Sequence, residues 1–122
     1  MNIDLLIVDD DVAVCDGLKV ALELNDYEVH TCRDANRAVE LIGSQPVSLA
    51  IIDCNMPNLS GSRATQLIRD LPSEIPIIGI SAEPDREDEM RQAGVSAFLP
   101  KPLEMSLLSR TIDELLEGHA VA

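Results

Sequence analysis

Several short apolar runs in this sequence end abruptly at a polar residue that could do chemistry. The polar residues at these ends are Asp9, Asp10, Asp11, Asp53, Ser81 and Lys101. A single aspartate or serine after a strand is ordinarily a helix cap or a turn residue. If the runs are parallel strands, however, their carboxyl ends meet at one edge of an open sheet, where α/β proteins bind their ligands. The arrival of all these residues at one edge therefore predicts a site.

Three of the aspartates, Asp9, Asp10 and Asp53, would share one pocket if their strands are neighbours. Carboxylates within a few ångströms repel one another by about 4 kcal/mol per close pair at an intermediate dielectric. Either one acid takes up a proton or a cation lies among them. Oxygen ligands without histidine or cysteine favour Mg²⁺.

A pocket of this composition suits phosphoryl transfer. An aspartate is ionised at neutral pH, so its carboxylate can attack phosphorus without a general base and form an acyl phosphate. Phosphoryl transfer depends mainly on positioning and on neutralising charge on the phosphoryl oxygens. Mg²⁺, the Lys101 ammonium and the Ser81 hydroxyl would each bind one of these oxygens.

The elements that must position these residues alternate between apolar runs and amphipathic segments. Strands are expected at residues 5–8, 27–32, 47–52, 76–80 and 95–99, with helices between them and a last helix at about 103–117. Asp11 and Asp34 are expected to cap helices, Pro84 to open one, and Gly43 and Gly94 to end two. Five successive β–α units predict an α/β fold with helices on both faces of a parallel sheet. The known solution of this size is the flavodoxin-like doubly wound five-stranded sheet of order 2-1-3-4-5.

Composition narrows the functional classes. We expect residues 1–122 to form a single domain, with a net charge of −13 that argues against direct binding to nucleic acid or anionic membrane. No apolar run approaches the ~18–20 residues of a membrane span, and no signal peptide is recognisable, so a cytoplasmic protein is expected. Cys15, Cys32 and Cys54 form no C-x-x-C pair and are expected to be reduced, packed thiols.

Taken in order, the motifs resemble the receiver domains of two-component response regulators over about residues 3–117. The matching residues are Asp9-Asp10, Asp53 with Met56-Pro57 and Gly61, Ser81-Ala82, and Phe98-Leu99-Pro100-Lys101-Pro102. Each motif is weak alone, but the ordered set at these spacings is specific. The resemblance implies a regulatory domain rather than an enzyme, one that promotes its own phosphotransfer and dephosphorylation.

The resemblance also implies the role of each site residue. Asp53 would be the phosphoacceptor. Mg²⁺ would be bound by Asp10 and Asp53 directly, by the backbone carbonyl of Asn55, and by Asp9 through water. Lys101 would pair with the phosphate, and its peptide bond to the following proline would be cis, an isomer that only X-Pro bonds adopt cheaply.

The family further implies a switch between Ser81 and Phe98. Ser81 would move to bind the new phosphate oxygen, and Phe98 would turn into the space it leaves, changing the face formed by the fourth helix, fifth strand and fifth helix. Ser81 stands where threonine is commoner, a change that keeps the hydroxyl. Phe98 lacks the tyrosine hydroxyl often found there, so an output signal that needs this group is not expected.

Two residues that flank the expected phosphate, Asn55 and Glu83, occupy positions that in the family tune hydrolysis of the acyl phosphate. We expect a phosphoryl group that lasts seconds to minutes. The fourth helix is rich in acids, and a partner that reads this face should carry a basic patch.

Neither His30 nor His119 lies in a helical bundle that could carry phosphohistidine, so the expected donor is another protein, a sensor histidine kinase or a histidine phosphotransfer protein. The start at Met1 favours a free-standing or N-terminal receiver, either a monomer or a weak dimer. It would act on a downstream protein target or a fused output domain.

Three other classes fit the sequence less well. A hydrolase of the haloacid-dehalogenase type needs a second aspartate two residues after its nucleophile, where this chain has Asn55, and it needs a cap insertion. A nucleotide-binding module needs G-x-x-x-x-G-K or G-x-G-x-x-G, and neither occurs. An inert receiver-like module would have lost Asp53, Asp10 or Lys101.

Overall fold

Five parallel strands form one sheet in the order β2-β1-β3-β4-β5. The computed structural model describes residues 3–56, 60–72 and 74–121, with the side chains of 118–121 left out. The strands are β1 (Ile3–Val8), β2 (Tyr27–Cys32), β3 (Val47–Asp53), β4 (Ile77–Ser81) and β5 (Ala97–Pro100). The helices are α1 (Val12–Glu23), α2 (Ala35–Ser44), α3 (Gly61–Arg69), the 3₁₀ turn η1 (Pro84–Arg86), α4 (Glu87–Ala93) and α5 (Met105–Val121). The predicted flavodoxin-like sheet order is confirmed.

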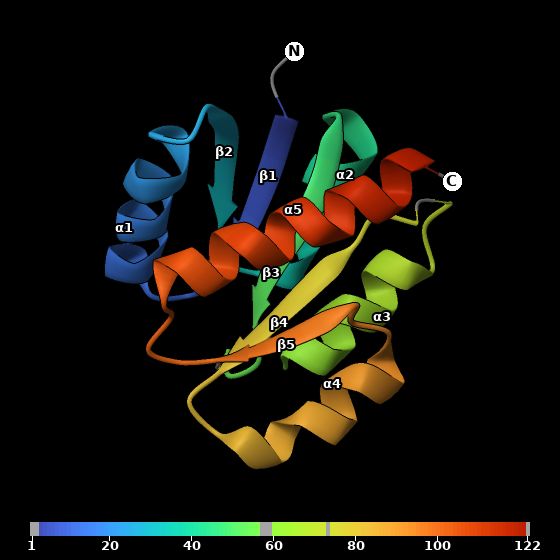
Figure 1. Cartoon of the computed structure of the whole chain (residues 1–122). Coiled ribbons are helices and arrows are strands. Elements are labelled where there is room, and N and C mark those ends of the chain that lie inside the picture. The colour runs from blue at the N-terminus through green and yellow to red at the C-terminus, as the bar shows by residue number, and fades with distance from the viewer. Residues whose placement is uncertain (1–2, 57–59, 73, 122) are drawn as a thin grey trace.

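Helices cover both faces of the sheet, with α1 and α5 on one face and α2, α3 and α4 on the other (Figure 1). The central strand β1 shows why its sequence is a continuous apolar run. Leu5 and Ile7 pack into the core under α1 and α5, whereas Leu6 and Val8 pack into the core under the other helices. All four side chains are fully buried, and each buried aliphatic side chain stabilises the fold by about 1.5–3 kcal/mol.

Side-chain caps start three of the helices, and two of these caps were predicted. Asp11 accepts hydrogen bonds from the backbone N–H of Ala13 and Val14, and Asp34 accepts one from Arg37. At α3 the cap is Ser60. Such caps are each worth about 1 kcal/mol, and those at Asp11 and Ser60 fix the helices that border the carboxyl edge of the sheet.

Some predicted helix ends were wrong. Gly43 lies inside α2, which ends at Ser44. Gln45 follows as the C-cap with extended backbone, the conformation that Pro46 favours in the residue before it. The segment opened by Pro84 begins as a 3₁₀ turn before α4, which ends at Gly94 as predicted, with φ of 118°. The last helix begins at Met105, two residues later than expected, and runs on to Val121.

The cysteines are free and buried, as predicted. Burial raises the pKa of the Cys32 thiol to about 12, so this group stays protonated and behaves as a small packed side chain. Among the described residues, no helix combines the length and the apolar character that crossing a bilayer requires.

Candidate functional site

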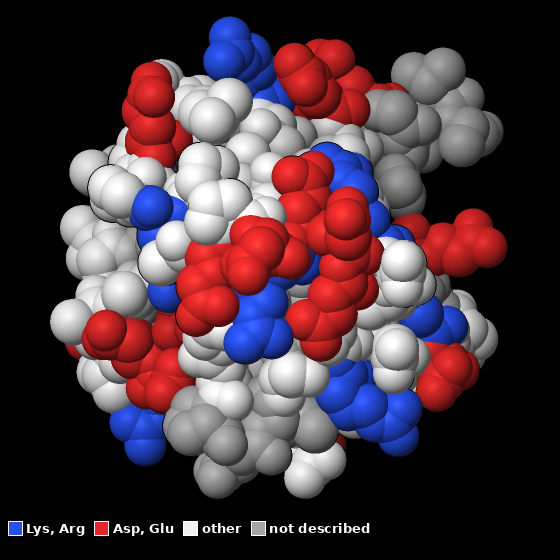
Figure 2. Space-filling model, turned by 90° about the horizontal axis from the view of Figure 1, so that it is seen from below, with Lys and Arg blue, Asp and Glu red and all other residues white. Residues whose placement is uncertain are grey.

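The aspartates that end β1 and β3 meet, as the predicted strand order requires. Carboxylate oxygens of Asp9, Asp10 and Asp53 all lie within 4.8 Å of one another. Asp9 and Asp53 are buried, whereas Asp10 is exposed to solvent. The strands point downwards in Figure 1, and the view from below in Figure 2 shows acidic side chains gathered at the centre of this face, with basic side chains among them.

Lys101 follows β5, and its side chain reaches two of these aspartates. Its Nζ lies 3.2 Å from Asp53 Oδ1 and 3.4 Å from Asp9 Oδ2, and its peptide bond to Pro102 is cis, as the resemblance implied. Burial alone would lower the pKa of Lys101, but the charges of Asp53 and Asp9 outweigh it and raise that pKa. The ammonium therefore stays charged at neutral pH.

The Asp9 carboxylate is hydrogen-bonded to other groups of the protein. Its carboxylate accepts a hydrogen bond from the backbone N–H of Asp11 (2.9 Å) and another from Lys101 (3.4 Å). Burial raises the pKa of Asp9, and the charge of Asp53 adds to the rise, against the lowering effect of these hydrogen bonds. Asp9 thus orients the lysine and adds negative charge beside Asp53.

Asp53 differs from Asp9 in the partners of its buried carboxylate oxygens. Among the described residues, the Lys101 ammonium, 3.2 Å away, is the partner of Oδ1, and no other hydrogen-bond donor reaches this oxygen. Such an atom is suited to a ligand that arrives from outside the chain.

Ser81 ends β4 and is buried beside this cluster. Its Oγ accepts hydrogen bonds from the backbone N–H of Glu83 (2.9 Å) and from Asn55 Nδ2 (3.5 Å). Asn55 Nδ2 also donates to Glu83 Oε1 (3.4 Å). The two residues predicted to flank the phosphate therefore already contact the serine predicted to bind it.

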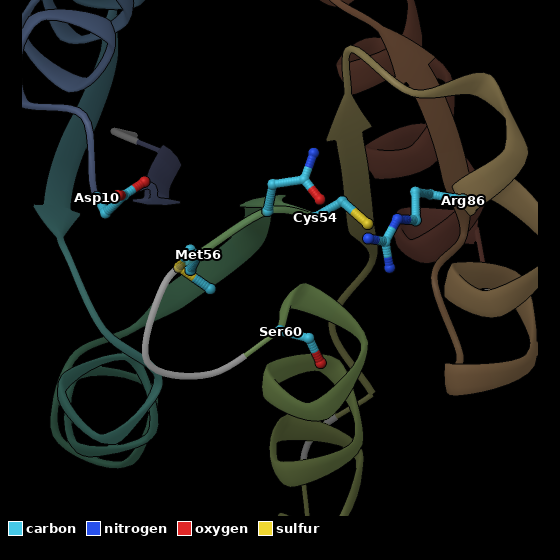
Figure 3. A pocket seen from close by; sticks show the side chains of 6 residues that line it. Asp10, Cys54, Met56, Ser60 and Arg86 are labelled. Atoms are coloured by element: carbon cyan, nitrogen blue, oxygen red, sulfur yellow. The ribbon is translucent and has the colours of Figure 1, made fainter.

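An open pocket of about 380 Å³ adjoins the aspartates (Figure 3). Its lining consists of Asp10, Cys54, Asn55, Met56, Ser60 and Arg86. Arg86 reaches in from the side of α4, across from Asp10 (Figure 3). Arg86 was not among the residues predicted for the site, although the three-residue spacing of Glu83, Arg86 and Glu89 is one that pairs charges along a helical segment.

Phe98, the second predicted switch residue, is half-buried on β5 and packs against the core under α2, α3 and α4. It pairs in register with Gly79 of β4, where an added Cβ would lie 3.5 Å from the Phe98 ring. The closest neighbour of that Cβ would be the Met90 methyl group at 2.9 Å, so glycine at this position makes room for Met90. The movement of Phe98 stays a prediction.

Gly61 sets the distance between α3 and the end of β3. Its N–H donates to the carbonyl of Cys54 (2.9 Å). A Cβ at this position would press on the carbonyl oxygen of Asp53 and lie 2.7 Å from Cys54 Cα. Because both neighbours are backbone atoms, neither can turn away.

We therefore expect Gly61→Ala to lower the free energy of unfolding by about 1–3 kcal/mol, the usual cost of overpacking. The control is Gly17→Ala in α1, where an added Cβ meets nothing within 4 Å; it should stabilise the chain by about 0.5–1 kcal/mol. Urea denaturation of both variants measures the difference. Equal stability of the two variants would contradict this account of α3.

A sheet of order 2-1-3-4-5 with an acidic pocket and a lysine at its carboxyl edge is the arrangement of a receiver domain. The chain belongs to the response regulator receiver domain family, whose sequence model matches residues 5–113. It is therefore a receiver domain of a two-component response regulator, and its role is regulatory. Receiver domains of this family bind Mg²⁺ at an acidic pocket, and this chain has a cluster of three aspartates.

Similar proteins include the response regulators MprA of Mycolicibacterium vanbaalenii and of Mycobacterium tuberculosis. Each is 30% identical over 118 residues, which cover 95% of this chain and 51% of the relative. The chain thus spans about half the length of these relatives. NtrX of Brucella abortus is similar in structure, with a TM-score of 0.88 and 25% identity over 99% of this chain and 28% of NtrX.

Two solved receiver domains match this chain over nearly the whole length of both proteins. The receiver domain of Francisella response regulator 1452 has a TM-score of 0.88 and 25% identity, covering 97% of this chain and 99% of that chain. A CheY-like receiver domain of Methanospirillum hungatei has a TM-score of 0.89 and 28% identity, covering 97% and 96%. The fold thus agrees with that of single receiver domains.

Proposed function

We propose that this chain accepts a phosphoryl group on Asp53 from the phosphohistidine of a sensor histidine kinase or a histidine phosphotransfer protein. The observation that carries the proposal is the buried Asp53 oxygen, which lies 3.2 Å from the Lys101 ammonium and has no other hydrogen-bond donor among the described residues. The edge of the sheet brings a charged lysine and a hydroxyl to the same place. These are the groups that an acyl phosphate requires.

The donor set fits a bound Mg²⁺. Three carboxylates offer oxygens within 4.8 Å of one another, and within the described part of the chain this group includes no histidine or cysteine. By family resemblance, Asp10, Asp53 and the backbone carbonyl of Asn55 would hold the ion, with Asp9 acting through water. When bound, Mg²⁺ supplies positive charge against the phosphoryl oxygens and offsets the repulsion among the acids.

In the proposed transfer, a carboxylate oxygen of Asp53 attacks phosphorus and the bond from phosphorus to the donor imidazole breaks. The electron pair of that bond remains on the imidazole nitrogen. Lys101 holds one phosphoryl oxygen by charge, and the Ser81 hydroxyl donates a hydrogen bond to another. Ser81 would then leave Asn55 and the Glu83 N–H, its present partners.

This departure of Ser81 is the proposed start of the switch. Phe98 would turn into the space, and the face of α4, β5 and α5 would change for a downstream protein or an output domain. Hydrolysis would return the chain to its unphosphorylated state. Water would attack the same phosphorus, and Asn55 and Glu83 would flank its path. A single domain over residues 1–122, present in the cytoplasm as a monomer or weak dimer, is proposed on the same resemblance.

Magnesium removal tests the proposal. With acetyl phosphate and Mg²⁺ the intact mass should rise by one phosphoryl group, and with excess EDTA the rise should be absent. Re-addition of Mg²⁺ should restore it, because the metal supplies charge that Lys101 cannot supply alone. Equal uptake in Mg²⁺ and in EDTA would exclude the proposed metal role.

A further inference from the structure

A series of polar side chains runs from the phosphoacceptor site to α3, across the connection between β4 and α4. Its members, in order, are Asn55, Glu83, Arg86, Glu89 and Ser62. Arg86 donates to Glu83 Oε2 through Nε (3.1 Å) and to Glu89 Oε2 through Nη1 (3.2 Å). The other oxygen of each carboxylate is engaged too, by Asn55 at Glu83 and by Ser62 at Glu89 (2.9 Å). The Arg86 guanidinium therefore lies between two carboxylates, and both oxygens of each carboxylate accept a hydrogen bond.

Glu83 is the acid of this series that lies nearest to the proposed reacting groups. Its carboxylate shares the Asn55 amide with Ser81 Oγ, and its backbone N–H donates to that same hydroxyl. A free carboxylate here would add a fourth negative charge to the three site aspartates. Because a phosphodonor is an anion, that charge would oppose its approach.

Arg86 is placed to cancel this charge. It lines the pocket together with Asp10 and Asn55, and Figure 3 shows its guanidinium close to Cys54. The pocket lining includes no other arginine or lysine. Arg91, on α4, forms a similar exposed ion pair with Glu87 (2.7 Å) and does not line the pocket.

We propose that Arg86 is a positioning residue for phosphoryl transfer: it holds the Glu83 carboxylate against Asn55 and neutralises it, so that an anionic donor reaches Asp53. The inference rests on the proposed function of Asp53. Arg86 and Glu83 are both well exposed, with side-chain accessibilities of 40% and 51%. Exposed ion pairs contribute little to folding, so the loss of Arg86 changes the reaction and leaves the fold intact.

The test compares Arg86→Gln with the matched variant Arg91→Gln, using two small phosphodonors at saturating Mg²⁺. Acetyl phosphate carries two negative charges at neutral pH and phosphoramidate a net charge of one. For Arg86→Gln, the second-order rate of phosphorylation by acetyl phosphate should fall about three- to fivefold, the scale of an exposed charge interaction. The loss should be smaller with phosphoramidate and should shrink in 0.5 M salt. Arg91→Gln should react at the wild-type rate.

A double-mutant cycle separates positioning of Glu83 from direct attraction of the donor. In a Glu83→Gln background, Arg86→Gln should leave the rate within about twofold, because no carboxylate remains to be neutralised. An equal loss in that background, or no loss in the single variant, would overturn the proposal. Failure of the proposed function looks different: the wild-type chain itself would take up no phosphoryl group.

Discussion

Asp53→Asn should leave the chain unable to take up a phosphoryl group from acetyl phosphate and Mg²⁺. Asparagine has nearly the same shape, so the buried end of β3 keeps its packing, but the amide oxygen is a far weaker nucleophile than a carboxylate. The remaining acids do not replace it, because Asp9 is held by Lys101 and the Asp11 N–H, while Asp10 forms no ion pair with Lys101 among the described residues. Intact mass after incubation with the donor measures the result.

The matched control for this variant is Asp16→Asn, which makes the same change on the exposed side of α1. It should be phosphorylated as fast as the wild type. Full uptake by Asp53→Asn would mean that another residue accepts the phosphoryl group, and the assignment of Asp53 would then be wrong.

Loss of the site lysine should have the next largest effect. Lys101→Ala should phosphorylate at least about 100-fold more slowly, the usual cost of removing one preorganised group that stabilises developing charge. The ammonium lies 3.2 Å from Asp53 Oδ1, and the neighbouring acids raise its pKa, so it is charged whenever the reaction runs. Initial rates with acetyl phosphate, followed by intact mass, give the comparison.

The sequence contains one other lysine, Lys19 of α1, and Lys19→Ala is the control. It should react at the wild-type rate. Calorimetry separates the role of Lys101 from metal binding: Lys101→Ala should bind Mg²⁺ at least as tightly as the wild type, because a competing positive charge is gone. A variant that loses Mg²⁺ affinity, or that reacts within threefold of the wild-type rate, would contradict the role given to Lys101.

The sequence was sufficient to predict the sheet order and the meeting of Asp9, Asp10 and Asp53. The reason is physical: parallel strands end at one edge, so residues that follow β1 and β3 become neighbours without any knowledge of side-chain conformation. The caps at Asp11 and Asp34 were also predictable, because a cap depends on residues within one turn.

Features that depend on packing could not be predicted in the same way. The contact between Ser62 and Glu89 joins residues 27 positions apart, and it depends on how closely α3 packs against α4. The need for glycine at Gly61 depends on the distance between a helix start and the backbone of Asp53. α2 continues through Gly43 and stops just before Gln45. A glycine inside a helix is tolerated, whereas the residue before a proline strongly favours extended backbone, so Pro46 decides where the helix ends.

Chemical mapping of the modified residue tests the central claim most directly. Borohydride reduces an aspartyl acyl phosphate to homoserine, and peptide mass spectrometry then identifies the position. After reaction with acetyl phosphate and Mg²⁺, homoserine should appear at position 53 and at no other aspartate, and it should be absent when Mg²⁺ is removed. Homoserine at position 9 or 10, or a phosphoryl group that resists reduction on another residue, would contradict the account.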